Sequence, residues 1–254
     1  MSLPLALLGG AGVSMLAYAA LGRRRDADVE LKGARFGGGG LDFLMHWFMW
    51  LLGPAERLFL RLETRPEALN VVGLAFGLAS GALIAFGRLE WGSIALALGG
   101  AADLLDGRVA RARGATSDFG KFLDSTVDRF VEAFVFLGFA AYLEPFPHGP
   151  LMAAAALAAS FLVSYARARG ESVGERGPSG LMQRAERLVL ACLASLCDGA
   201  LAERLRLPPG TLVFWTLAVI AAGSLLTAAH RAVAIGIALR RRSRRAESSR
   251  RAKE

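Results

Sequence analysis

The sequence predicts an all-α integral membrane protein: a bundle of six transmembrane helices with an additional N-terminal membrane anchor and an interfacial amphipathic helix. Three observations predict this fold class. Long apolar segments recur along the chain, aspartates gather at two neighbouring segments, and arginines gather in alternate connections. A helix needs about 20 mostly apolar residues to cross a bilayer. Six segments approach or exceed that length, at residues 70–87, 91–111, 119–143, 150–169, 182–202 and 210–238.

The composition agrees with a membrane protein and argues against other classes. Of the 254 residues 54% are hydrophobic, and 30 Lys and Arg residues outnumber 22 Asp and Glu residues. A nucleic-acid-binding protein would carry its basic residues on a polar, soluble surface, so no nucleic acid partner is expected. The two cysteines, Cys192 and Cys197, lie in an apolar segment, which indicates neither a disulfide framework nor a thiolate metal site.

The first 63 residues are predicted to hold two elements outside the main bundle. Residues 1–25 form an uncleaved membrane anchor, because three arginines follow the apolar run, whereas a signal peptide carries positive charge before it. Residues 26–63 comprise a glycine-rich linker and an amphipathic helix lying in the interface, with arginines at four-residue spacing on one face. A short spanning helix is the alternative for this second element.

The distribution of arginine predicts the orientation of the main membrane domain, residues 64–239. Three connections, at residues 88–90, 144–149 and 203–209, hold few arginines, and the alternate connections and both flanks hold nearly all the others. By the positive-inside rule, the arginine-rich connections face the cytoplasm, together with a basic tail at residues 240–254. The protein is therefore expected in the cytoplasmic (inner) membrane, in contact with its lipids.

Four aspartates stand where two of these helices meet the cytoplasmic side. Asp103 and Asp106 share one helical face, and Asp124 and Asp128 share a face of the next helix. An uncompensated aspartate in a membrane costs about 3 kcal/mol, so four would cost roughly 10 kcal/mol. Divalent cations would offset that cost, and oxygen ligands select hard ions such as Mg²⁺ or Mn²⁺. Any single aspartate could instead pair with a nearby arginine, but that does not explain the pattern of all four.

Small residues beside the aspartates leave room for a substrate. Gly107, Ala110 and Gly120 would accommodate a bulky group, and Arg111 could hold a phosphate. A pair of metal ions suits phosphoryl-type transfer, because the ions bridge phosphate oxygens and neutralise developing charge. We therefore expect an active site with two divalent ions facing the cytoplasm.

These residues resemble the signature of the CDP-alcohol phosphatidyltransferases, D-x2-D-G-x2-A-R-x8-G-x3-D-x3-D. Every fixed position is matched within residues 103–128, and the resemblance covers about residues 64–238. It implies a six-helix membrane enzyme, usually a homodimer, in which an alcohol displaces CMP from CDP-diacylglycerol. The matching positions imply metal ligands at Asp103, Asp106, Asp124 and Asp128, a general base at Asp128, and CDP-lipid contacts at Gly107, Ala110, Arg111 and Gly120.

One motif departs from the family. Its members often read PNxLT where the first core helix begins, and this chain reads PEALN at residues 66–70. Glu67 stands where the family has asparagine and Asn70 where it has threonine or serine, so the resemblance does not carry the family's nucleotide contacts over to that helix start.

A second resemblance concerns the acceptor. The segment at residues 164–187 is similar to "SYxKARAE...GGLIERPER" of phosphatidylinositol phosphate synthases, and residues 227–231 are similar to their "TxxQR". The resemblance implies that Arg167, Arg184 and Arg231 bind the phosphate of inositol phosphate. Arginine stands where the subfamily has lysine at 167, and positions 183 and 185 also differ, so glycerol phosphate remains an alternative acceptor. Each arginine alone could be an ordinary cytoplasmic flank.

Two other classes of function compete with an enzyme. An ion-coupled transporter would also place carboxylates in a membrane, but transporters commonly bind ions near the bilayer centre, and these carboxylates gather near one face. A non-catalytic scaffold would have lost signature residues, and none is lost.

Overall fold

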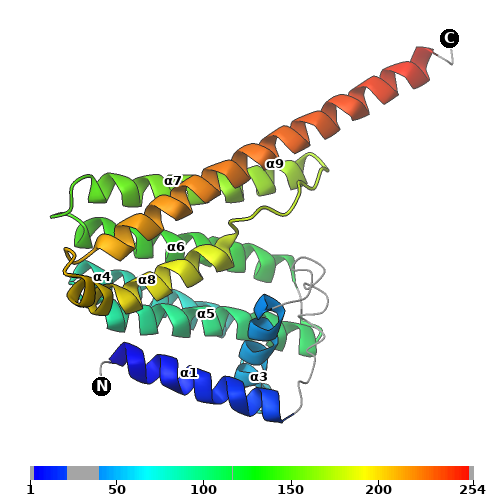
Figure 1. Cartoon of the computed structure of the whole chain (residues 1–254). Helices are drawn as coiled ribbons and strands as arrows, with labels where there is room; N and C mark the ends of the chain where they lie inside the picture. The colour runs from blue at the N-terminus through cyan, green and yellow to red at the C-terminus, as the bar shows by residue number, and fades with distance from the viewer. Residues whose placement is uncertain (1–2, 22–39, 116, 252–254) are drawn as a thin grey trace.

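The described residues form eight helices and no strand (Figure 1). The computed structural model describes residues 3–21, 40–115 and 117–251, so the predicted linker lies largely outside the described residues. The helices are α1 (Leu3–Ala20), α3 (Gly40–Arg61), α4 (Pro66–Ala85), α5 (Leu89–Ala112), α6 (Asp118–Tyr142), α7 (Gly149–Ser172), α8 (Arg184–Leu205) and α9 (Thr211–Arg251). The predicted all-α class is confirmed.

Helices α4 to α9 pack as one bundle. Helix α4 packs against α5 and α6, α7 packs against α6 and α9, and α8 packs against α5 and α9. Helix α3 crosses α5 at a steep angle, and α1 lies next to α3 (Figure 1). The two helices that carry the aspartates are therefore held from several sides by the rest of the bundle.

The six predicted apolar segments each coincide with one helix of the bundle. Three helical stretches are long and apolar enough to cross a membrane by length and composition: Pro66–Ala85, Gly149–Ser172 and Thr211–Arg244. Helices α5, α6 and α8 are of similar length but carry more charged residues. The charges that define the site are thus also what makes these three helices less apolar.

Glycines allow α4 to approach α6 closely. A Cβ atom on Gly81 would lie 2.4 Å from the carbonyl oxygen of Phe134, and one on Gly138 would lie 2.4 Å from that of Gly81. One on Gly77 would lie 2.6 Å from a methyl group of Val131. These distances are too short for any side chain, so glycine at these positions permits the close contact between the two helices.

The core and the helix ends explain why the bundle holds this arrangement. Phe136 and Phe139 of α6 are fully buried and belong to one apolar cluster with residues of α4, α7, α8 and α9. Asp198 of α8 is also buried, and its carboxylate accepts hydrogen bonds from the backbone N–H groups of Gly210 (2.7 Å) and Leu212 (3.0 Å). This carboxylate caps the start of α9, as expected for an anion at a helix N-terminus.

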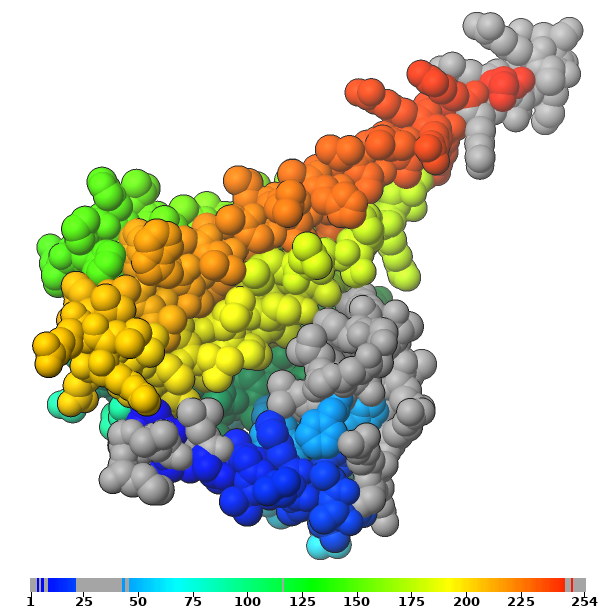
Figure 2. Space-filling view, in the orientation of Figure 1, coloured from blue at the N-terminus to red at the C-terminus, as the bar shows by residue number. Residues whose placement is uncertain are grey.

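Helix α9 is longer than predicted. Its apolar segment was expected to end at residue 238, but the helix continues to Arg251 through most of the basic tail. Its last turns project beyond the rest of the bundle (Figures 1 and 2). The extension contains arginine and alanine, which favour helix, and lacks glycine and proline.

The N-terminal helices are attached to α5 by polar contacts. Glu56 of α3 forms an ion pair with Arg108 of α5 at 2.6 Å. Arg113 donates to the carbonyl oxygens of Leu60 (3.2 Å) and Thr64 (3.0 Å) at the end of α3. Helix α3 is therefore tied to the helix that carries Asp103 and Asp106.

Candidate active site

The site forms where the end of α5 faces the start of α6. Helix α6 begins at Asp118 because Ser117 accepts a hydrogen bond from the backbone N–H of Gly120 at 2.9 Å, which is an N-cap. From that start, Asp124 and Asp128 are four residues apart and lie on one face. The cap thus fixes the rotation at which α6 presents its carboxylates to α5.

Three of the four predicted aspartates meet closely. Asp103 of α5 and Asp124 and Asp128 of α6 each offer a carboxylate oxygen, and these atoms all lie within 4.8 Å of one another. Oxygen atoms at this spacing would repel one another as three free anions. A shared cation would stabilise them together.

The fourth predicted ligand, Asp106, lies one turn along α5 from Asp103 and is outside that group of three. It is 5% exposed, and its Oδ2 atom has no hydrogen-bond partner among the described residues. A buried carboxylate oxygen without a donor is costly. A cation would relieve this cost, so the position fits a ligand that completes the site.

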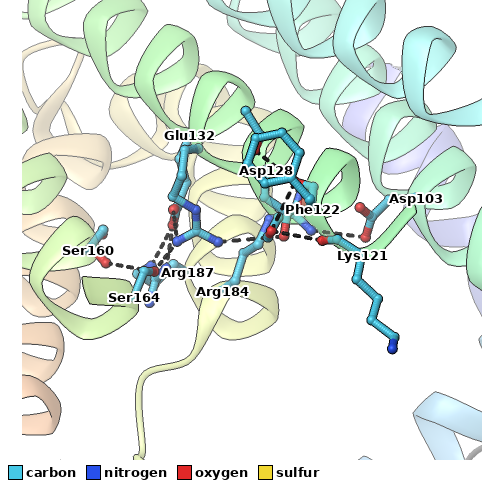
Figure 3. Close-up of polar contacts among 12 residues, drawn as sticks. Asp103, Lys121, Phe122, Asp128, Glu132, Ser160, Ser164, Arg184 and Arg187 are labelled. Carbon is cyan, nitrogen blue, oxygen red and sulfur yellow. Dashed lines mark hydrogen bonds and ion pairs between the residues drawn. The ribbon is translucent and has the colours of Figure 1, made fainter. Parts of the chain in front are cut away.

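Arg184 connects the two aspartate helices. Its guanidinium group lies 2.9 Å from Oδ2 of Asp103 and 2.8 Å from Oδ1 of Asp128 (Figure 3). The side chains of all three residues are largely shielded from solvent, with 14–25% exposed. Arg184 is therefore the predicted acceptor residue that the structure brings directly to the carboxylates.

A second ion-pair network, which the sequence did not predict, lies one turn further along α6 from Asp128. Glu132 of α6 is fully buried and accepts a hydrogen bond at 2.7 Å from Arg187 of α8, which is 1% exposed. Arg129 is 3.2 Å from Glu132 and 3.5 Å from Asp128, and it donates to the hydroxyl group of Ser164. The four-residue spacing of Asp124, Asp128 and Glu132 was the signal that could have revealed it.

The predicted CDP-lipid residues lie around the carboxylates. Gly107 and Ala110 are half-buried on α5, and a Cβ atom on Gly107 would lie 3.1 Å from the guanidinium group of Arg111. Arg111 is exposed at the end of α5, and Gly120 is in the first turn of α6. The structure thus places these four residues on the two helices that carry the aspartates.

A crevice reaches from this cluster into the bundle. Its walls include Asp103 and Arg184, with Asn70 and Gly73 of α4 and Val131 of α6. Asn70 is one of the two positions, with Glu67, at which the sequence departs from the family motif, and it is buried and shares this crevice with Asp103. The start of α4 therefore contributes to the site in spite of that departure.

The other two predicted acceptor residues are engaged elsewhere in this structure. Arg167 is exposed on α7 and forms an ion pair with Glu171 of the same helix at 3.1 Å. Arg231 of α9 is buried and donates hydrogen bonds to the carbonyl oxygens of Val163 (2.9 Å) and Pro178 (3.3 Å). These contacts are with a glutamate and with backbone carbonyl oxygens, whereas Arg184 pairs with Asp103 and Asp128.

Comparison with known proteins identifies the family. Residues 63–222 match the model of a family described as CDP-alcohol phosphatidyltransferase. The chain belongs to this family. The matched range begins close to the predicted start of the main membrane domain, and it contains all four aspartates.

Several curated relatives share a more specific name. The chain is 36% identical over 197 residues to a phosphatidylinositol phosphate synthase of Streptomyces avermitilis. This match covers 74% of the present chain and 79% of the Streptomyces protein. The chain is also 38% identical over 136 residues to an archaetidylinositol phosphate synthase of Methanothermobacter thermautotrophicus. That match covers 54% of the present chain and 68% of the Methanothermobacter protein.

Solved structures of the family agree with the fold. The phosphatidylinositol phosphate synthase of Mycobacterium tuberculosis with CDP-DAG bound has a TM-score of 0.63 and 26% identity, and the match covers 72% of this chain and 92% of that one. The same protein in complex with manganese and citrate has a TM-score of 0.63 and 27% identity, and that match covers 72% and 87%.

The carboxylates of this phosphatidyltransferase fit a divalent cation. The donor set is made only of oxygen, which suits Mg²⁺ and Mn²⁺. The closeness of the three carboxylates and the unpartnered oxygen of Asp106 are both relieved by such an ion. The predicted divalent-ion cofactor is thus consistent with the geometry.

Proposed function

We propose that this protein transfers the phosphatidyl group of CDP-diacylglycerol to a hydroxyl group of inositol phosphate and releases CMP, as a step of phospholipid synthesis. The observation that carries the proposal is the meeting of three carboxylates, with oxygen atoms within 4.8 Å of one another, two of which are bridged by Arg184. The carboxylates suit the cations that a diphosphate requires, and Arg184 suits a phosphate on the acceptor. The names of the relatives support inositol phosphate as that acceptor.

The residues take separate roles in this proposal. Asp103, Asp106, Asp124 and Asp128 would hold two Mg²⁺ or Mn²⁺ ions, which when bound neutralise charge on the diphosphate and polarise the phosphorus that is attacked. Gly107, Ala110, Arg111 and Gly120 would accommodate the cytidine diphosphate group. Arg167, Arg184 and Arg231 would bind the acceptor phosphate.

Asp128 would also be the general base. It is the last carboxylate of the series and is held between Arg184 and Arg129, so its position is fixed from both sides. It would take the proton from the acceptor hydroxyl as the oxygen attacks the lipid-side phosphorus, and CMP would leave with the electrons of the broken P–O bond. A base in hydrogen-bond reach of that hydroxyl accelerates such a step.

We also propose how the helices are arranged in the membrane. Helices α4 to α9 would all span the inner membrane, since the three less apolar helices pack side by side with the three apolar ones. Helix α1 would be an anchor, α3 would lie in the interface, and the site would face the cytoplasm. A homodimer is proposed from the family resemblance.

CMP release against a panel of acceptors tests the proposed reaction. Purified protein is mixed with CDP-diacylglycerol, Mn²⁺ or Mg²⁺, and either inositol phosphate, glycerol phosphate, serine or inositol. We expect CMP release to be at least about tenfold faster with inositol phosphate than with serine or inositol, because one well-placed phosphate contact contributes about 1.4 kcal/mol or more. Release should also be faster than with glycerol phosphate, as the names of the relatives suggest. Faster release with glycerol phosphate would refute the acceptor, and no release with any acceptor would refute the reaction.

A further inference from the structure

We propose that Arg184 and the divalent cations compete for the same carboxylate groups, so that cation binding releases Arg184 to bind a substrate phosphate. This inference deepens the proposed function and rests on it for the identity of the phosphate. It makes Arg184 a phosphate-binding residue that links the occupancy of the cation site to that of the phosphate site.

The contacts of Arg184 carry this inference. Its Nη1 atom lies 2.9 Å from Asp103 Oδ2, and its Nη2 atom lies 2.8 Å from Asp128 Oδ1. These two aspartates supply two of the three carboxylates that meet within 4.8 Å. The guanidinium group therefore spans α5 and α6 on the groups a cation would bind, as Figure 3 shows. Each ion pair occupies one oxygen of a carboxylate that a cation would bind, so the guanidinium group and a cation draw on the same two carboxylates.

The balance of charge decides whether the carboxylates bind Arg184 or the divalent cations. Four carboxylates offer four negative charges, and Arg184 supplies one positive charge against them. Two divalent cations would supply four positive charges and would repel the guanidinium group at short range. After cation binding, Arg184 is stabilised only by a new anion, and a phosphate oxygen pair matches the planar donors of arginine.

Arg184 also has an unused donor. Its Nε atom is buried and has no hydrogen-bond partner among the described residues. A buried N–H group without an acceptor is costly, so the present contacts do not satisfy this side chain fully. A phosphate that accepts from Nε and one Nη atom would satisfy it better.

The neighbouring arginine shows what a fixed ion pair looks like. Arg187 lies one turn further along α8, is 1% exposed, and is paired with the fully buried Glu132. No cation site includes Glu132 among the described carboxylate groups. Arg184 is therefore the arginine expected to exchange its carboxylate partners for a phosphate, because those partners are themselves candidate cation ligands.

Competition of this kind makes the two binding events reciprocal. If cations release Arg184 for phosphate, then phosphate must tighten cation binding by the same factor. Replacing Arg184 removes the competitor, so cations should then bind more tightly without any phosphate. If phosphate instead bound the metal directly, phosphate would also tighten cation binding, but this effect would persist after Arg184 is replaced.

Mn²⁺ binding to the purified full chain tests the inference without any turnover. Electron paramagnetic resonance measures free Mn²⁺ during titration, with and without inorganic phosphate, corrected for Mn²⁺–phosphate association measured without protein. For the unaltered protein, phosphate should tighten Mn²⁺ binding about fivefold or more. For Arg184→Gln, Mn²⁺ should bind about fivefold tighter than to the unaltered protein, and phosphate should have no further effect.

Two more variants complete the design. Arg204→Gln removes an exposed arginine from the last turn of the same helix and should behave as the unaltered protein. Arg184→Lys serves if the glutamine variant does not fold, because one ammonium group bridges two carboxylates poorly, so Mn²⁺ should again bind more tightly than to the unaltered protein.

Equal or weaker Mn²⁺ binding to the folded Arg184 variant would overturn the inference, as would a phosphate effect of the same size in that variant. The result is independent of CMP release. A protein that shows the coupling but releases no CMP would refute the proposed reaction alone, and the reverse result would refute the coupling alone.

Discussion

Asp128 is the residue at which the two charge networks of the site meet. It forms an ion pair with Arg184 on one side and with Arg129 on the other, and Arg129 continues to the buried Glu132. Its carboxylate is thus oriented from two directions, which favours a role that depends on precise position. The sequence predicted Asp128 as metal ligand and base, but the residues that orient it became visible only in the structure.

Replacing Asp128 by asparagine tests the base. We expect Asp128→Asn to lower CMP release by about 10²- to 10⁴-fold, because the amide cannot accept the hydroxyl proton. Binding of CDP-diacylglycerol in the presence of Mn²⁺ should be largely kept, since three aspartates remain. Asp118→Asn is the matched control, as Asp118 is exposed and forms an ion pair with the exposed Lys121. Normal turnover of Asp128→Asn would contradict the assignment.

Glu132 is expected to act on stability. Glu132→Gln leaves Arg187 buried without its anion, and breaking a buried ion pair on one side costs about 3–5 kcal/mol. Thermal unfolding of the detergent-solubilised protein should therefore occur at a clearly lower temperature. Glu171→Gln breaks an exposed ion pair with Arg167 and should change stability by less than about 1 kcal/mol. Equal unfolding temperatures for the two variants would show that the buried pair stabilises nothing.

At the scale of elements, apolar length and helix signals located the helices well. Predicted segment 150–169 became α7 at Gly149–Ser172, and segment 70–87 became α4, which begins at Pro66 because proline suits the first turn of a helix. The end of α9 was missed, because a polar helix that continues past the apolar core has no hydrophobic pattern to reveal it.

The side-chain pattern predicted which residues gather but not how they pair. Fixed spacing placed Asp124 and Asp128 on one face of α6. It could not show that Arg184, far along the chain, would reach Asp103, or that Arg187 would reach Glu132, because such contacts depend on the packing of α8 against its neighbours. Arginines at cytoplasmic ends of helices look alike in a sequence whether they bind phosphate, pair with acids or face water.

The contact between α4 and α6 yields a prediction for that element pair. Gly138→Ala would place a methyl group 2.4 Å from the carbonyl oxygen of Gly81, which forces the helices apart and costs about 1–3 kcal/mol. Because α6 carries Asp124 and Asp128, CMP release should fall as well. Gly236→Ala is the control, since a Cβ atom there meets nothing within 4 Å. A variant at 138 that unfolds at the same temperature as the control would show that the helices are not in close contact.

At the scale of the whole molecule, the bundle has two ends of different character. The connections from α5 to α6 and from α7 to α8, and the extension of α9, lie at the end that holds the carboxylates and most of the arginines. The connections after α4, α6 and α8 lie at the other end and are poor in arginine. This asymmetry predicts that the end with the carboxylates faces the cytoplasm.

Single cysteines at the two ends test that orientation. The free Cys192 and Cys197 are first replaced by alanine, and Glu144→Cys and Ser243→Cys are then introduced separately at exposed positions. In intact bacterial cells, a membrane-impermeant thiol reagent should label the cysteine at position 144 and should label that at position 243 only after lysis. Position 243 lies at the end of the bundle that holds the carboxylates, which we expect to face the cytoplasm. From there the site can take up soluble inositol phosphate and release CMP. Labelling of position 243 in intact cells would place the site on the outer side and refute both the orientation and this supply of substrate.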